Sequence, residues 1–203
     1  MKRFVDLKTR FSGVHDLMKF RVTEILLIST LYDGFVLEED GQLSEQIYNQ
    51  FADLSLPIVP RIQRVSCLEE ALEALATRTF HLIITMSRIS DMSSFEFEKT
   101  LKKSYPDIPI VMLSYDRLTA GMIARIRENT CINRVFHWSG DSKILLAIIK
   151  YIEDQQNVEA DSKQGVQTIL LVDDSPIYYS QILPIIYTEI LTQTRYLVSH
   201  AMN

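Results

Sequence analysis

The sequence predicts an α/β fold built on a doubly wound parallel sheet, and three observations lead to this class. Short, nearly uninterrupted apolar runs recur along the chain, which is typical of strands buried on both faces. Stretches with the helical period of about 3.6 residues lie between these runs. Five strand–helix pairs follow one another over residues 22–154. Such alternation requires right-handed crossovers, which place helices on both faces of one parallel sheet.

The individual elements follow from these periodicities and from their flanking residues. The predicted strands are residues 24–30, 60–65, 80–86, 109–114 and 134–137. The predicted helices are residues 33–53, 67–77, 93–104, 117–128 and a last helix from 141 or 142 to about 154. Ser66, followed by Glu69 three positions later, has the capping-box pattern and is expected to start the second helix.

Residues 1–21 are predicted to form an amphipathic helix ahead of this unit. Phe4, Leu7 and Phe11 continue at helical spacing into Val14 and Met18, so they share one stripe. The stripe is too short to stand alone and must dock. Its own domain, a second subunit and a membrane surface are the three candidate docking partners.

The chain also repeats itself. Residues 24–30 (EILLIST) recur as residues 168–174 (TILLVDD), after a polar, aperiodic stretch at 155–167 that reads as a linker. The second copy ends in Asp173 and Asp174, whereas the first ends in two hydroxyls. A carboxylate pair at the end of a strand can hold a divalent cation, and Ser-Thr cannot do so at useful affinity.

After the second copy, Ser175-Pro176 is expected to start a helix that Pro184 interrupts, and residues 195–199 are predicted to be a further strand. This partial second β-α-β unit, residues 168–203, is too small to complete a core. We therefore expect the chain to be the leading part of a longer protein that continues its second domain.

Bulk composition narrows the function classes. A formal net charge of −5 argues against a nucleic-acid binder, which would show a basic field. No apolar run approaches the roughly 18 residues of a membrane span, and no signal peptide is visible, so a cytoplasmic protein without membrane attachment is expected. Cys67 and Cys131 have neither metal nor redox spacing. The six glycines are scattered, which argues against a cofactor-binding phosphate loop.

Over residues 24–154 the chain resembles a response-regulator receiver domain, and Ile169-Leu170-Leu171-Val172-Asp173-Asp174-Ser175 resembles the opening of a second one. The resemblance implies a flavodoxin-like (βα)5 sheet. Members of the family accept a phosphoryl group on an Asp that ends the third strand. An acidic pair that ends the first strand holds Mg²⁺. A Ser or Thr ends the fourth strand, and a Lys ends the fifth.

On this sequence those positions fall on residues of different chemistry. The acidic pair falls on Ser29 and Thr30, the acceptor on Met86, the hydroxyl on Ser114 and the Lys near Trp138. A thioether has no nucleophilic oxygen, so we expect a degenerate pseudo-receiver that is not phosphorylated at Met86, holds no cofactor and is not an enzyme. The loop carboxylates Asp33, Asp91 and Asp116 are expected to be solvated or capping groups. In the second unit, Asp173 and Asp174 would bind Mg²⁺ only if that receiver is complete.

The whole chain also resembles the N-terminal segment of multidomain proteins similar to phosphoenolpyruvate synthase and pyruvate phosphate dikinase. The resemblance runs through residues 22–30, 37–41, 135–138, 145–150 and 165–172. It implies a non-catalytic regulatory and interaction module at the head of a larger phosphoenolpyruvate-utilising or signalling protein. The alternative is a two-component response regulator in a phosphorelay, with a phosphorylatable second receiver. Expected partners are downstream domains of the same protein, or a histidine kinase or phosphotransfer protein.

The last helix of the first unit is apolar almost all round. Its apolar residues are Leu145, Ile148, Ile149, Tyr151 and Ile152, with neighbours of the same kind. One face is expected to cover the sheet. The other face would otherwise be exposed, and it is predicted to pack on the N-terminal helix, the next domain or a second subunit in a homodimer.

Overall fold

The computed structural model describes residues 18–30, 32–34, 43–86, 94–115 and 131–201. Its five strands are β1 (Glu24–Ile28), β2 (Arg61–Val65), β3 (Leu82–Met86), β4 (Ile110–Ser114) and β5 (Arg134–His137). All neighbours pair in parallel, in the order β2-β1-β3-β4-β5. The predicted α/β class, the five strands and the single parallel sheet are confirmed.

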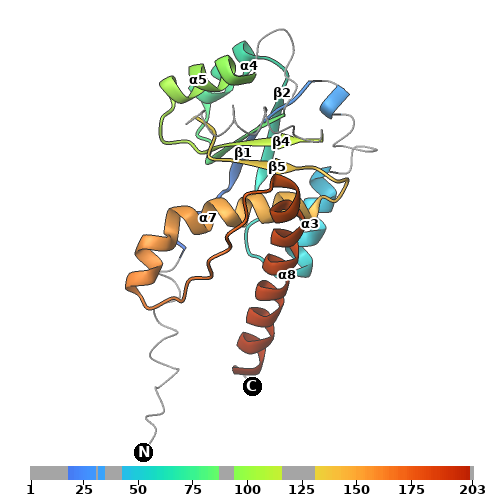
Figure 1. The fold of residues 1–203 in the computed structure, drawn as a ribbon, viewed down its shortest axis with the longest axis vertical. Helices are drawn as coiled ribbons and strands as arrows, with labels where there is room; N and C mark the ends of the chain where they lie inside the picture. The colour runs from blue at the N-terminus through green and yellow to red at the C-terminus, as the bar shows by residue number, and fades with distance from the viewer. Residues whose placement is uncertain (1–17, 31, 35–42, 87–93, 116–130, 202–203) are drawn as a thin grey trace, which may run out of the picture.

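Helices cover both faces of this sheet (Figure 1). The described helices are α3 (Leu43–Asp53), α4 (Leu68–Thr77), α5 (Ser94–Ser104), α7 (Lys143–Lys163) and α8 (Pro176–Ala201). α4 and α5 cover one face, and α3, α7 and α8 lie against the other. The predicted helix 117–128, together with Phe4, Leu7 and Phe11, lies outside the described residues. A helix was predicted over residues 1–21. It does not reach residue 21, because residues 18–21 are not helical.

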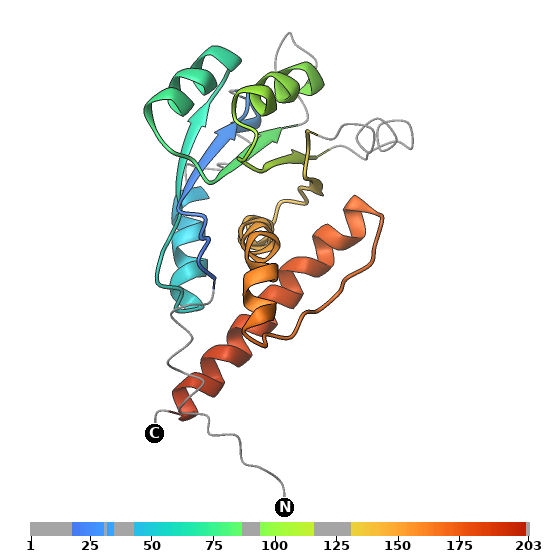
Figure 2. The ribbon, with the colours of Figure 1, turned by 90° about the vertical axis from the view of Figure 1, so that its left-hand side faces the viewer.

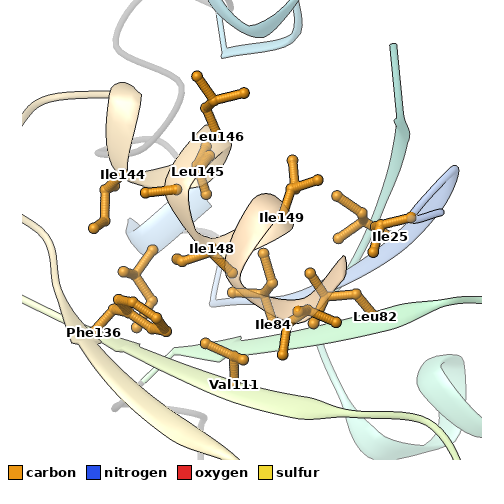
Figure 3. Close-up of a cluster of buried hydrophobic side chains, with 14 of the residues drawn as sticks. Ile25, Leu82, Ile84, Val111, Phe136, Ile144, Leu145, Leu146, Ile148 and Ile149 are labelled. Carbon is orange, nitrogen blue, oxygen red and sulfur yellow. The ribbon is translucent and has the colours of Figure 1, made fainter. Parts of the chain in front are cut away.

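The buried core explains why β1, β3 and β4 read as nearly continuous apolar runs. Successive side chains of a strand point to opposite faces, and here both faces are covered. Figure 3 shows the largest of the three buried clusters, between the sheet and α7. Its labelled members are Ile25, Leu82, Ile84, Val111, Phe136, Ile144, Leu145, Leu146, Ile148 and Ile149. The alternate strand residues, such as Leu26 and Ile83, pack with α4 in the second core.

The start of α4 differs in detail from the capping box expected at Ser66. The helix begins one residue later, with Cys67 as its N-cap. Ser66 pairs with Glu70 rather than with Glu69. The Glu70 carboxylate accepts hydrogen bonds from the Ser66 amide (2.7 Å) and hydroxyl (2.9 Å). These bonds hold the pKa of Glu70 below its usual value.

The predicted linker is wrong over residues 155–163, because α7 continues as one helix of 21 residues to Lys163. Three polar side chains along one side of α7 bind the non-helical residues 18–22, which we call the strap. The amides of Met18, Phe20 and Val22 donate to Asp161 (3.1 Å), Asn157 (2.9 Å) and Glu153 (3.0 Å), respectively. The donors are two residues apart on the strap and the acceptors four residues apart on α7, so alternate strap residues meet successive turns of the helix.

The predicted second β-α-β unit is also not formed. Residues 166–175 are not a strand, and α8 runs unbroken for 26 residues through Pro184, so residues 195–199 are helical. Residues 166–175 do not form a strand because a lone strand has no neighbour with which to pair its main chain. Buried contacts of Tyr179 and Leu183 before the proline, and of half-buried Tyr187 after it, hold the helix together across Pro184.

The N-terminal part of α8 docks on the outer edge of β5. The Tyr179 hydroxyl donates to the Val135 carbonyl, and the His137 amide donates to Ser180 Oγ (2.9 Å). The Arg134 guanidinium lies 4.1 Å from the centre of the Tyr179 ring. These contacts satisfy polar groups of an edge strand that would otherwise be open to pairing with another chain. α8 therefore belongs to the first unit.

α7 is covered by α8 and α3, which belong to the same unit. The predicted contacts with the N-terminal helix, a next domain or a second subunit stay predictions. Leu145, Ile148, Ile149 and Ile152 are all buried, and Tyr151 is half-buried. The phenol of Tyr151 lies edge-to-face with Phe136 at 5.7 Å between ring centres. In the part of the chain described, no helix is long and apolar enough to cross a bilayer.

Candidate functional site

The four receiver-like positions of the first unit meet at the carboxyl edge of the sheet. The strand register aligns Ile28 with Thr85 and Ser114 with His137, so the residues that end these strands lie along one edge. The Trp138 amide donates to the Ser114 carbonyl (2.8 Å). The structure thus brings together the residues that the sequence placed there: Ser29, Thr30, Met86, Ser114 and Trp138.

Two of these positions are filled by apolar side chains that belong to the core. Met86 is 0% exposed and Trp138 is 9% exposed, and both join the same buried cluster as Leu113. A receiver needs a carboxylate and an ammonium group at these two places. Here a thioether and an indole supply neither a nucleophilic oxygen nor a formal charge.

The hydroxyl positions are buried and offer weak ligands. Ser29 and Ser114 are both 0% exposed, and Ser29 Oγ has no hydrogen-bond partner among the described residues. Thr30 Oγ1 accepts a hydrogen bond from the Asp33 amide (3.0 Å), which ends the strand in a local turn. Neutral hydroxyls cannot replace the carboxylates that a hard divalent cation selects.

Asp33 is the one loop carboxylate near this edge that the structure describes, since Asp91 and Asp116 fall outside the described ranges. It is buried rather than solvated as predicted, with 2% exposure. Its carbonyl accepts from the Tyr115 hydroxyl (3.1 Å), while its Oδ2 has no partner within the described ranges. Over those same ranges no three His, Cys, Asp or Glu side chains are grouped to hold a metal ion.

A second buried carboxylate near the end of β3 was missed by the sequence analysis. Glu98 of α5 is 0% exposed, and its Oε1 accepts a hydrogen bond from the Thr85 hydroxyl (3.1 Å). Thr85 precedes Met86 and points to the opposite face of the sheet. The available signal was the spacing of Glu98 three residues before Leu101, which places both on the buried side of the helix.

Asp173 and Asp174 lie at the entrance to α8 rather than at the end of a paired strand. Asp173 Oδ1 accepts from the Ser175 amide (2.7 Å), and its carbonyl accepts from Arg134 (3.4 Å). Asp173 therefore positions the first turn of α8 against β5. The Mg²⁺ pair predicted here stays a prediction, because it depends on further ligands from a second sheet.

Comparison with known proteins bears on the fold. No protein-family model matches the chain, and no curated protein matches it. Among solved structures, the signal receiver domain of a putative Luxo repressor protein from Vibrio parahaemolyticus is similar, with a TM-score of 0.52 and 10% identity, over 70% of this chain and 98% of that one. A CheY-like response regulator receiver domain protein from Methanospirillum hungatei is similar at a TM-score of 0.52 and 16% identity, over 68% of this chain and 98% of that one.

A two-component response regulator from Clostridium difficile is similar at a TM-score of 0.50 and 18% identity, over 66% of this chain and 98% of that one. The strand order β2-β1-β3-β4-β5 is that of flavodoxin-like sheets. Strand order and structural likeness together identify the fold as that of a response-regulator receiver domain.

Proposed function

We propose that residues 22–154 are a receiver-like regulatory and interaction module that takes no phosphoryl group at the usual acceptor position. The observation that supports this most is the complete burial of Met86 at the end of β3. Transfer to a carboxylate brings negative oxygens together, and a divalent cation and a lysine normally neutralise them. Ser29, Thr30 and Trp138 stand where those groups would be needed.

Such a module works through its contacts rather than through chemistry. Its proposed partners are downstream domains of the same protein, or a histidine kinase or phosphotransfer protein. Since α8 and α3 already cover α7, we assign the proposed homodimer contact to the stripe of Phe4, Leu7 and Phe11.

Beryllofluoride, which mimics an acyl phosphate on a receiver aspartate, tests the proposal. The 203-residue chain is titrated with beryllofluoride and Mg²⁺ and followed by fluorine NMR, with an active receiver domain as positive control. We expect only the free-ion signals from this chain. A bound signal that requires Mg²⁺ would contradict the proposal, since it would show a working acceptor site.

A second candidate function is a two-component response regulator whose second receiver carries the phosphoryl group. The repeat of β1 at residues 168–172, followed by Asp173 and Asp174, favours it. Phosphodonor labelling of the protein as encoded in full, followed by peptide mapping, tests this reading. Label on an aspartate beyond Asn203 would support it, and absence of label would reject it.

The nature of the parent protein rests on the resemblance of five sequence segments to phosphoenolpyruvate-utilising enzymes. We propose that the module precedes such an enzyme. ATP-dependent formation of phosphoenolpyruvate from pyruvate by the protein as encoded in full is the corresponding assay. Lack of this activity under conditions where a known synthase works would reject the proposal.

A further inference from the structure

An exposed apolar run precedes α8. Within residues 168–172, Ile169 is 70% exposed, Leu170 83% and Val172 84%, while Leu171 is half-buried against the core. Among the described residues, no main-chain group of residues 168–172 pairs with another main-chain group. Four consecutive apolar residues thus lie outside the sheet that the structure describes.

The same sequence in β1 shows what environment this run fits. β1 pairs on both sides, with β2 and with β3, and its apolar residues are buried on both faces. The run matches β1 at Ile169, Leu170 and Leu171, and substitutes Val172 for Ile28. Apolar residues at consecutive positions suit an interior strand of a parallel sheet that helices cover on both sides.

α8 carries a second apolar stripe beside the one that docks on β5. Tyr178 is 62% exposed, Ile182 38% and Ile185 69%, and their spacing of four and three places them on one side of the helix. At about 100° per residue, this side lies roughly 110° around the helix from buried Tyr179 and Leu183. No charged residue occurs between Ser175 and Thr188.

We propose that the exposed run and the outer stripe of α8 form one docking surface for a second parallel α/β sheet, supplied by polypeptide that follows Asn203. The run becomes an interior strand of that sheet, and α8 covers one of its faces. Figure 2 shows the run leading up to the start of α8, from where the helix turns back, as in a strand–helix unit. α8 is then a helix shared by two cores, with its inner stripe on β5 and α7.

The chemistry of the run favours a sheet over a second copy of this chain. Two runs paired about a two-fold axis would make a two-stranded ribbon, which leaves apolar side chains exposed and is marginal by itself. An interior position in a covered sheet buries both faces. The inference rests on the second candidate function in one respect, because it requires another α/β unit. It does not require that unit to be phosphorylated.

A shared helix also couples the two units rigidly. The inner stripe is held by bonds from Tyr179 and Ser180 to the main chain of β5. Any shift of the second sheet on the outer stripe would therefore reach β5 through one helix, with no flexible linker between them.

Amide hydrogen exchange at residues 169–172 tests the proposal. In the 203-residue chain we expect these amides to exchange at nearly the unprotected rate. In the protein as encoded in full, we expect them to be protected by on the order of a hundredfold or more, as in buried strands. Equal, unprotected exchange in both would overturn the proposal, as would a gene that ends at Asn203. Protection that grows with the concentration of the 203-residue chain would overturn it in favour of a second copy.

Two variants sharpen the test. Leu170→Asp should leave the Tm of the 203-residue chain unchanged, yet reduce the protection of residues 169–172 in the full protein at least about tenfold. Tyr48→Asp, at a 59% exposed position of α3, is the matched control and should change neither quantity. Equal tolerance of both variants in the full protein would overturn the proposal. Protection without phosphodonor label would uphold the shared helix and reject the phosphorelay function, so the two failures are distinguishable.

Discussion

The side-chain amide of Asn157 pairs with both main-chain polar groups of Phe20. Its Oδ1 accepts from the Phe20 amide (2.9 Å), and its Nδ2 donates to the Phe20 carbonyl (2.8 Å). Asn157 is 3% exposed and lies in the stretch that composition alone assigned to a linker. It acts as a neighbouring strand would, and so fastens the strap to α7.

Replacing Asn157 should loosen the strap. Asn157→Ala leaves the amide and carbonyl of Phe20 without partners, and we expect the free energy of unfolding to fall by about 2–3 kcal/mol. Chemical denaturation measures this change. Gln156→Ala, which removes an exposed amide one position earlier, should change stability by less than about 0.5 kcal/mol. Equal effects of the two substitutions would show that the strap contact contributes nothing.

Tyr179 should give the fold an alkaline limit. Burial raises the pKa of its phenol from 10.0 to about 12. Because the folded pKa is the higher one, the stability gained by keeping the phenol neutral is full below pH 10 and is lost as the pH rises towards 12. Tyr179→Phe should remove the share of this dependence that comes from Tyr179, while Tyr187, whose pKa burial also raises, keeps its own. The substitution should cost about 1–3 kcal/mol at neutral pH, since the Val135 carbonyl loses its partner.

Unfolding free energies measured across the alkaline range check this prediction. Tyr178→Phe is the adjacent control at a 62% exposed position, and it should follow the unmodified protein at every pH. An alkaline decline of equal size in Tyr179→Phe and in the unmodified protein would assign it to another group, such as Tyr187.

Restoring an acid at the acceptor position should harm the fold rather than create a site. Met86→Asp places a carboxylate in a fully buried apolar cluster without a cation, and we expect a loss of roughly 3–5 kcal/mol. Met86→Leu should cost less than about 1.5 kcal/mol. Thermal unfolding distinguishes the two, and a stable Met86→Asp protein would mean that the pocket still admits water or a cation.

The Thr85–Glu98 pair should behave as a coupled unit. Thr85→Val removes the hydroxyl that donates to the buried Glu98 carboxylate, at an expected cost of about 1–3 kcal/mol. Replacing both residues, as Thr85→Val with Glu98→Leu, should cost less than the sum of the single changes. A double-mutant cycle measures this coupling, and strict additivity would contradict a shared hydrogen bond.

The sheet could be predicted from sequence because each strand carries its own signal. β1, β3 and β4 are short apolar runs that fit one environment, a strand buried on both faces. The receiver-like positions could be predicted because they lie at or just after the ends of the strands. The structure adds that Met86 and Trp138 are buried within the core, so these two positions do not form an open, charged pocket.

Residues 155–203 could not be predicted because their structure depends on distant partners. Residues 155–163 look like a polar linker until Asn157 and Asp161 are seen to bind the strap. Residues 168–172 have the pattern of a strand but no described neighbour to pair with. Pro184 has the usual effect of ending a helix, yet packing on both sides of it holds α8 together.

Whether residues 22–154 have lost phosphoryl transfer can be measured on the 203-residue chain itself. The chain is incubated with Mg²⁺ and acetyl phosphate, and its intact mass is determined beside an active receiver domain treated in the same way. We expect one unmodified species from this chain and a phosphorylated fraction from the control. A hydroxylamine-sensitive adduct that maps to the carboxyl edge of the sheet, for example to Asp33, would show that the site remains chemically competent.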